Sequence, residues 1–110
     1  MNARPELVQV EPDFLNMVIF GRNTKYNIIK ALMMFPNLIV SDLIFVTRSN
    51  GGILRKHLDT FLEQDMVKEI PGKAKNPTRY HLNEDHEIIA TIMRLINQYV
   101  PDVKTHSKRI

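Results

Sequence analysis

Residues 49–82 read SNGGILRKHLDTFLEQDMVKEIPGKAKNPTRYHL, and this stretch decides the fold. It opens with the polar turn 49–52, after which apolar residues recur at helical spacing up to residue 64. The pattern then changes to two short strands, 66–70 and 78–82, joined by a loop that holds two prolines and two lysines. The stretch therefore predicts a helix followed by a β-hairpin with a cationic tip.

The residues before this stretch predict an N-terminal arm and further helices. Residues 1–12 form the arm, and apolar residues then crowd a short helix over residues 13–22. Asn23 or Thr24 caps a second helix. That helix ends before Pro36, because proline cannot continue a helix.

The remaining elements follow from short local signals. Residues 38–40 are apolar and predict a short strand, and Ser41 then caps a third helix of about two turns. After the hairpin, Asn83 caps a last helix over residues 83–100. Residues 101–110 form a polar, basic tail.

The composition limits the classes of protein to which this chain can belong. Its 110 residues are 44% apolar and 25% charged, which suits a single domain over residues 1–110. The chain has no cysteine, which excludes disulfides, zinc fingers and thiolate catalysis and predicts a cytoplasmic protein. No stretch reaches the roughly 18 apolar residues that a membrane span needs. The formal charge of +3 favours an anionic partner.

The order of these elements predicts a mainly α fold with a small β-hairpin. This order is that of a winged helix-turn-helix with flanking N- and C-terminal helices: helix, short strand, helix, turn, helix, hairpin and helix. In that fold the second helix of the pair lies in the major groove of duplex DNA, and the hairpin reaches phosphates or the neighbouring minor groove.

Basic residues gather on the elements that would touch DNA. There they would neutralise phosphates, which supplies most of the non-specific affinity. Arg55 and Asn50 are also suited to pair with guanine and adenine in the major groove. The predicted DNA-binding residues are Arg48, Ser49, Asn50, Gly51, Gly52, Arg55, Lys56, Lys73, Lys75, Asn76 and Arg79.

Several short motifs in the same region are similar to motifs of a known class of proteins. The predicted reading helix and the start of the hairpin contain Lys56-His57-Leu58, Phe61, Asp65 and Met66-Val67. The hairpin closes with Tyr80-His81-Leu82. In these motifs, and in the segment that opens the second helix, residues 20–96 resemble bacterial and archaeal regulators of the ArsR/MarR type. The resemblance implies a winged helix-turn-helix that binds duplex DNA.

The chain departs from that resemblance at the metal-binding positions. Residues 38–43 align with the metal-sensing box of ArsR-type repressors, but Ile39 and Ser41 stand where that box has its thiolates. Thiolate metal sensing is therefore excluded. Asp85 and His86 are adjacent and have no companion pair, so neither a metal nor another cofactor is expected.

Two places need an unusual backbone. Gly51 and Gly52 allow two interpretations: a flexible loop, or helix N–H groups that approach a phosphate closely. Asp65 stands where the resembling families carry a glycine at the end of the reading helix. Aspartate tolerates the left-handed conformation better than most residues, so the helix can still end there.

The first and last predicted helices carry more apolar residues than one small core would bury. If the surplus were exposed, it would form a patch that soluble monomers rarely carry, so a second copy is the expected partner. A twofold homodimer would place two reading helices about 34 Å apart on a palindromic operator. The alternative is that the two helices only pack on each other within one chain. The expected dimer residues are Phe14, Leu15, Val18, Ile19, Ile89, Ile92, Met93, Ile96 and Tyr99.

The motifs of common enzyme classes are missing from the sequence, so no catalytic residue is expected. The serines lack a nucleophile-elbow context, and no glycine-rich phosphate loop is present. The sequence therefore predicts a dimeric, sequence-specific transcription regulator that represses by covering a promoter. The helix at 50–64 would read the major groove, and the wing at 71–79 would contact phosphates or the minor groove. The rival hypothesis is a winged-helix module for protein–protein contacts in a transcription or chromosome-associated complex.

Overall fold

Seven elements follow one another in the computed structural model, which describes residues 6–101 and residue 103. Within these residues the fold is mainly helical with a small antiparallel β-hairpin, as the sequence predicts. The elements are η1 (Asn16–Phe20), α1 (Thr24–Met34), α2 (Val40–Thr47), α3 (Gly51–Glu63), β1 (Val67–Ile70), β2 (Arg79–Leu82) and α4 (Glu87–Tyr99).

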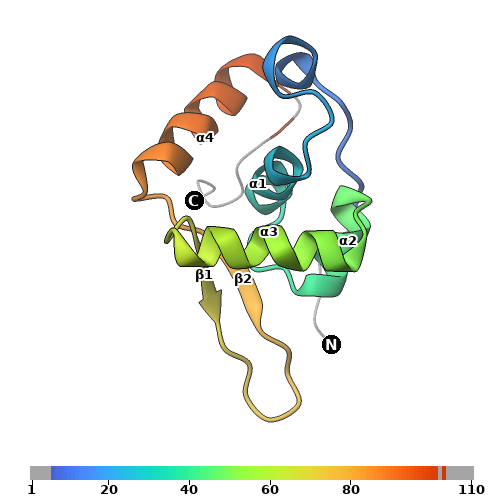
Figure 1. The fold of residues 1–110 in the computed structure, drawn as a ribbon, viewed down its shortest axis with the longest axis vertical. Coiled ribbons are helices and arrows are strands. Elements are labelled where there is room, and N and C mark those ends of the chain that lie inside the picture. Colours follow the sequence, from blue (N-terminus) through green and yellow to red (C-terminus); the bar gives the residue numbers. More distant parts are fainter. Residues whose placement is uncertain (1–5, 102, 104–110) are drawn as a thin grey trace.

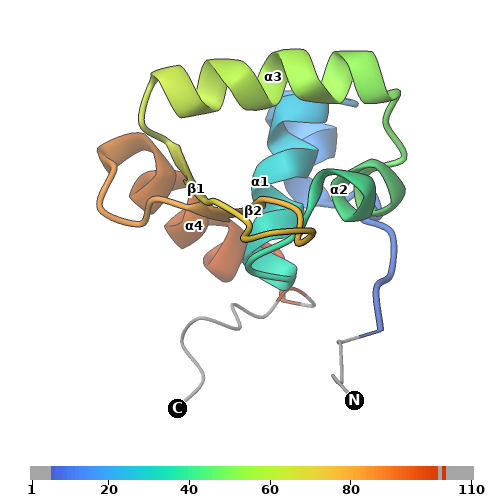
Figure 2. The ribbon, with the colours of Figure 1, turned by 90° about the horizontal axis from the view of Figure 1, so that it is seen from below.

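Helix α1 lies at the centre of the arrangement. Helix α3 lies on one side of it and α4 on another, and the hairpin extends beyond the helices (Figures 1 and 2). Ile28, Ala31 and Met33 of α1 are at most 1% exposed, because neighbouring elements cover this helix on several sides. This central burial leaves the outer faces of α3 and α4 available for contacts with other molecules.

The predicted limits of the second helix are confirmed. The Asn23 side chain accepts a hydrogen bond from Tyr26 N at 3.1 Å and so caps α1. The helix ends at Met34, two residues before Pro36. Of the two proposed capping residues, Asn23 is therefore the cap and Thr24 is the first helical residue.

The predicted strand 38–40 is reduced to a single residue. Leu38 forms an isolated bridge with Tyr80, in which Leu38 N donates at 3.2 Å and Leu38 O accepts at 2.8 Å. The prediction that Ser41 caps the next helix is wrong: α2 begins at Val40, and its N-cap Ile39 makes no side-chain hydrogen bond. The difference arises because only Leu38 pairs with β2, and the extended Ile39 that follows is already the N-cap of the helix.

Each strand of the hairpin begins one residue later than predicted and ends at the predicted residue. Val67 pairs with Leu82 and Ile70 with Arg79 in an antiparallel register. Val67 and Leu82 are buried and anchor the base of the hairpin in the core, whereas Ile70 and Arg79 are exposed. Asp65 precedes the hairpin with φ 62°, the left-handed conformation that its position predicts.

The start of the last helix differs from the prediction. Asn83 does not cap it: Asn83 Nδ2 donates to Asp65 O at 2.8 Å, and its Oδ1 accepts from Asp85 N at 3.1 Å. These bonds hold the turn between β2 and α4 against the end of α3. The cap of α4 is His86, whose Nδ1 accepts from Ile88 N at 3.1 Å.

Parts of the predicted arm and tail belong to the folded core. Val10 is buried, and its N–H donates to Val46 O at 2.8 Å, which places the arm along α2. Val103 is also buried, so the segment after α4 is not entirely a polar tail. Residues 1–5, 102 and 104–110 of the predicted arm and tail lie outside the described residues.

A buried ion pair fastens the arm to α1. Lys30 Nζ lies 2.7 Å from Asp13 Oδ2, with side chains only 5% and 8% exposed, and it also donates to Glu11 O at 2.6 Å. Tyr26 Oη donates to the same Asp13 oxygen at 2.8 Å. Burial opposes ionisation of Asp13, but hydrogen bonds from Lys30, Asn16 and Tyr26 outweigh it, so the pKa of Asp13 is lowered.

Candidate nucleic-acid interface

One face of α3 packs on the core and the opposite face is open. Leu54, Leu58 and Phe61 are buried. No other element covers the outer side of α3 among the described residues (Figure 2). The outermost exposed positions recur at helical spacing and are Gly52, Lys56, Asp59 and Glu63.

The open face therefore carries both signs of charge. Lys56 lies in the first half of α3, where Arg55 is also exposed, and Asp59 and Glu63 lie in the second half. The described residues provide no ion-pair partner for Arg55 or Lys56, so both cations are available to an anionic ligand. Glu63 was not recognised as outward-facing from the sequence, although its seven-residue spacing from Lys56 was visible there.

Asn50 and the paired glycines have structural roles at the start of α3. The Asn50 side-chain oxygen accepts from Gly52 N at 2.8 Å and Ile53 N at 3.2 Å, which makes Asn50 the N-cap. Only its Nδ2 group remains free to donate, so the expected two-bond contact of Asn50 with adenine is not available. Gly51 and Gly52 form the first turn of α3, which rules out the flexible-loop interpretation.

Two other predicted contact residues are already engaged within the chain. Arg48 adopts φ 57° at the end of α2, and its Nη2 lies 3.1 Å from Glu11 Oε2. Both side chains of this ion pair are exposed, so solvent screens it. The Ser49 hydroxyl lies 2.6 Å from Thr47 Oγ1. Arg48 and Ser49 thus help to shape the turn between α2 and α3.

The hairpin tip presents cations that have no acidic partner among the described residues. Lys73 and Lys75 are exposed on the loop between the strands, and Asn76 N donates to Lys73 O at 2.9 Å to close the tip. A Cβ atom at Gly72 would lie 1.7 Å from Asn76 O, so this position accepts only glycine unless the backbone moves. The loop extends away from the helices, and Lys73 and Lys75 lie on it (Figure 1).

Arg79 and Arg55 lie near the base of the hairpin on two different neighbouring elements. Arg79 Nη1 donates to Asn37 O at 3.1 Å, so this guanidinium is anchored on the turn between α1 and α2. Burial and the Glu69 carboxylate raise the pKa of Tyr80, and the nearby charge of Arg55 opposes that rise. The charge of Arg55 on α3 therefore reaches Tyr80 of β2, where the carboxylates of Glu69 and Asp59 act in the opposite direction.

A basic contact that sequence analysis missed comes from α1. Burial lowers the pKa of His57 in α3, and the charges of Lys25 and Lys56 lower it further. Lys25 is exposed in the first turn of α1. Lys25 therefore lies near His57 and the first half of α3, which no periodicity within one helix could have shown.

The expected dimer residues divide into core and surface residues. Leu15, Ile89, Met93 and Ile96 are buried in the core of their own chain, so they present no surface to a second copy and that part of the prediction is wrong. The exposed members are Phe14, Val18, Ile19 and Tyr99, and Ile92 is half-buried.

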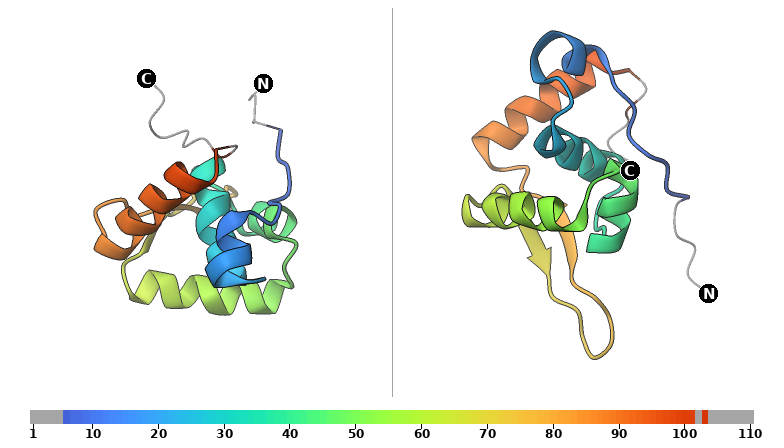
Figure 3. Two further views of the ribbon diagram at one scale, coloured as in Figure 1. Left: turned by 90° about the horizontal axis from the view of Figure 1, so that it is seen from above. Right: turned by 45° about the vertical axis from the view of Figure 1, so that its right-hand side comes forward.

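The apolar surface extends beyond the predicted residues. Met17 is 80% exposed on η1, and Ile88 is exposed at the start of α4. The rings of Phe14 and Tyr99 stack with centroids 5.8 Å apart, which joins the segment around η1 to the end of α4 (Figure 3). The two predicted helices thus contact each other within one chain, yet most of their additional apolar residues stay exposed.

Helix α4 carries two parallel apolar stripes. One stripe is buried against the core and comprises Ile89, Met93, Ile96 and Val100. The other comprises Ile88, Ile92, Leu95 and Tyr99, with exposed ends and a half-buried middle. The second stripe and the exposed residues around η1 form what we call the apolar face: Phe14, Met17, Val18, Ile19, Ile88, Ile92, Leu95 and Tyr99.

Within the described part of the chain, no three His, Asp or Glu side chains are grouped closely enough to hold a metal ion. In the same residues, no helix is both long and apolar enough to cross a membrane. Comparison of the chain with protein-family models, with curated proteins and with solved structures gives no match.

Proposed function

We propose that this chain is a cytoplasmic winged helix-turn-helix protein that binds duplex DNA and regulates transcription. The observation that carries the proposal is that the first half of α3 and the hairpin tip both present exposed cations, Arg55 and Lys56 on the helix and Lys73 and Lys75 on the tip, for which the described residues provide no ion-pair partner. Such a surface supplies the phosphate contacts on which DNA affinity mainly depends. Repression follows if the bound protein covers a promoter.

The charge distribution limits how α3 can approach DNA. Asp59 and Glu63 face outward from its second half, where they would repel phosphates. The first half carries Arg55 and Lys56, and an arginine there can pair with guanine. We therefore propose that α3 enters the major groove by its N-terminal end and that Lys25 contacts the flanking phosphates.

Replacing Arg55 and Lys56 together with alanine tests this function. Each phosphate contact changes the logarithm of the binding constant by about 0.9 per tenfold change in salt concentration. One contact therefore strengthens binding roughly 8-fold at 0.1 M salt relative to 1 M salt. The double variant should therefore bind a random-sequence duplex roughly 60-fold more weakly per bound protomer, with a salt slope lower by about 1.8. Fluorescence anisotropy between about 50 and 200 mM salt measures both quantities.

The matched control changes the acids on the same helix. Asp59→Ala with Glu63→Ala should leave DNA affinity unchanged or raise it, because it removes repulsion. If the cation variant binds DNA as the wild type does, α3 is not the DNA-binding element. The rival function, a protein-binding winged helix, is favoured by those same outward acids and by the apolar face, and it would then be preferred.

We also propose that the apolar face joins two copies of the chain. Ile19 is 65% exposed and Met17 80%, and soluble monomers rarely expose many large apolar side chains in one region. The second stripe of α4 has the alternating four- and three-residue spacing that pairs helices side by side. A twofold axis beside α4 would bring two such stripes together and leave both hairpins free.

A charged substitution in this face should separate the copies. Ile19→Glu is expected to raise the dimer dissociation constant at least tenfold, because a desolvated carboxylate without a partner would lie in the interface. Sedimentation velocity over a concentration series measures this change. Val8→Glu, at an exposed apolar residue on the arm, is the matched control and should leave the assembly unchanged. A wild-type chain that stays monomeric throughout the series contradicts the proposal.

A further inference from the structure

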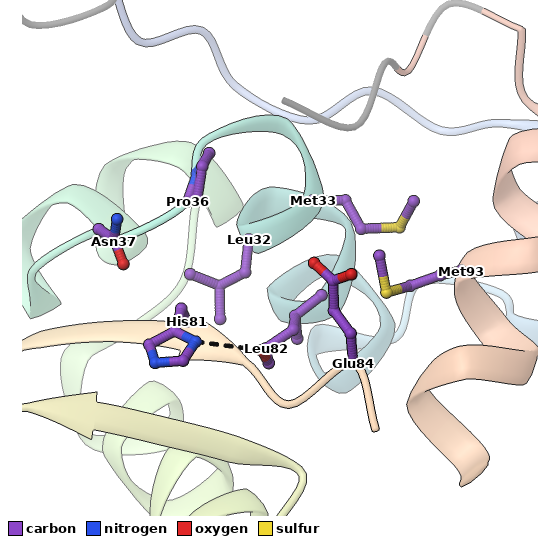
Figure 4. A pocket seen from close by; sticks show the side chains of 8 residues that line it. All are labelled: Leu32, Met33, Pro36, Asn37, His81, Leu82, Glu84 and Met93. Carbon is purple, nitrogen blue, oxygen red and sulfur yellow. Dashed lines mark hydrogen bonds between the residues drawn. The ribbon is translucent and has the colours of Figure 1, made fainter. Parts of the chain in front are cut away.

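A cavity lies at the base of the hairpin, between α1, β2 and α4. Its volume is about 200 Å³, which is the share of roughly six or seven water molecules in the liquid. Met33 of α1 and Met93 of α4 point toward each other across it, and the Glu84 carboxylate lies beside them (Figure 4). These three residues come from different elements and surround one space.

The lining suits a particular chemistry. Met33 and Met93 are almost fully buried, and methionine side chains adapt their shape to an apolar or aromatic ligand. Glu84 is exposed at the cavity, where it has no ion-pair partner among the described residues. No Lys or Arg of the described residues lines the cavity. The lining combines the apolar side chains of Leu32, Met33 and Met93 with polar groups, and a free carboxylate without a neighbouring base favours an organic cation over an anion.

The cavity wall is also the attachment of the hairpin. His81 and Leu82 belong to β2, and the His81 ring bonds to Leu82 O at 3.1 Å. Asn37, on the opposite wall, has φ 67° and accepts the hydrogen bond from Arg79. Strained residues of this kind often mark functional positions. A ligand that widens or narrows the cavity would shift β2 relative to the turn after α1.

We infer that this cavity binds a small organic cation with an apolar body and that occupancy changes the orientation of the hairpin. Glu84 would hold the cationic group at the entrance, while Met33 and Met93 would contact the body. The inference rests on the proposed function only where the hairpin movement alters DNA binding. Ligand binding and the response of the hairpin stand independently of it.

Methyl NMR of the full chain tests the site, with benzylammonium as the probe. The signals of Met33 and Met93 should shift in a saturable way, while that of exposed Met17 serves as an internal control and stays constant. Benzyl alcohol has the same body without the charge, and benzoate has the opposite charge. Benzylammonium should bind most tightly, and benzoate should not saturate.

The variant Glu84→Gln removes the charge from an exposed position that carries no structural bond in the described residues. It should weaken benzylammonium binding about three- to fivefold and leave benzyl alcohol binding unchanged. Equal affinity of the variant and the wild type for benzylammonium, or shifts at Met17 as large as those at Met33, would overturn the site.

The response of the hairpin has its own readout. The amide signals of Arg79 and Tyr80 should move with the same saturation curve as the methionine methyl signals. If the methyl signals saturate and these amides do not move, the ligand site stands and its coupling to the hairpin is overturned. A separate anisotropy measurement of duplex affinity with and without benzylammonium shows whether the movement reaches DNA binding. Loss of DNA binding in both samples contradicts the proposed function and leaves the ligand site intact.

Discussion

Asp13→Ala should destabilise the fold by about 3–5 kcal/mol, the typical result of removing one partner from a buried ion pair. The Lys30 ammonium would remain buried with only Glu11 O as its acceptor, and the Tyr26 hydroxyl would lose its acceptor. In a domain of this size the loss should lower the melting temperature by at least about 12 °C. Urea unfolding at neutral pH, followed by circular dichroism, measures the free energy of unfolding.

A second ion pair of the arm provides the matched control. Arg48 and Glu11 are exposed, so Arg48→Ala should cost no more than about 1 kcal/mol. Replacing both buried partners, as in Asp13→Leu with Lys30→Met, should cost less than Asp13→Ala because no charge is left unpaired. A loss below about 1 kcal/mol for Asp13→Ala would show that the arm does not depend on this pair.

The same pair predicts how stability depends on pH. The pKa of Asp13 is lowered in the folded state, because the bonds from Lys30, Asn16 and Tyr26 outweigh the effect of burial. Its contribution is therefore complete above the ordinary aspartate pKa of about 3.9 and is lost as the pH falls through the lower folded value. The Asp13→Ala variant should lack this part of the acid sensitivity.

Reversing the charge of the hairpin tip should nearly abolish DNA binding. Lys73→Glu with Lys75→Glu removes two phosphate contacts, worth roughly 60-fold at 0.1 M salt, and adds two carboxylates that repel the backbone. The expected loss of affinity is on the order of 10³-fold per bound protomer. Anisotropy with a random-sequence duplex measures it, and an unchanged circular dichroism spectrum shows that the exposed tip does not hold the fold together.

The control places a charge reversal on another element. Arg94→Glu on α4 changes the net charge in the same direction, and it should alter affinity only a few-fold if contact position matters more than total charge. If Arg94→Glu and the hairpin variant weaken binding to the same extent per charge, the hairpin makes no specific contact with DNA.

The sequence predicted elements whose signals are local. The cap Asn23, the left-handed Asp65 and both hairpin strands follow from residue types at fixed spacing, and the structure confirms them. The start of α4 was wrong because Asn83 and His86 are both able to cap a helix. The position of Asp65 O, which lies at the end of another helix, decides that Asn83 bonds elsewhere.

The candidate site shows the same limit. Arg55 and Lys56 are exposed, as their positions in the motif predict. The side-chain oxygen of Asn50, however, accepts the hydrogen bonds that cap α3. Arg48 pairs with Glu11, which is far from it in sequence, and no local pattern reveals such a partner. The sequence therefore did not predict the contacts between segments that are far apart along the chain.

The two stripes of α4 carry nearly the same residues one position apart, so rotating the helix by about 100° would turn the second stripe into the core in place of the first. Three isoleucine, leucine or methionine side chains would still enter the interior after that rotation. Only the last pair differs in kind, since a tyrosine ring would have to occupy the small space of buried Val100. Tyr99, which stacks on Phe14, is thus the residue that distinguishes the native orientation of α4 from the rotated alternative.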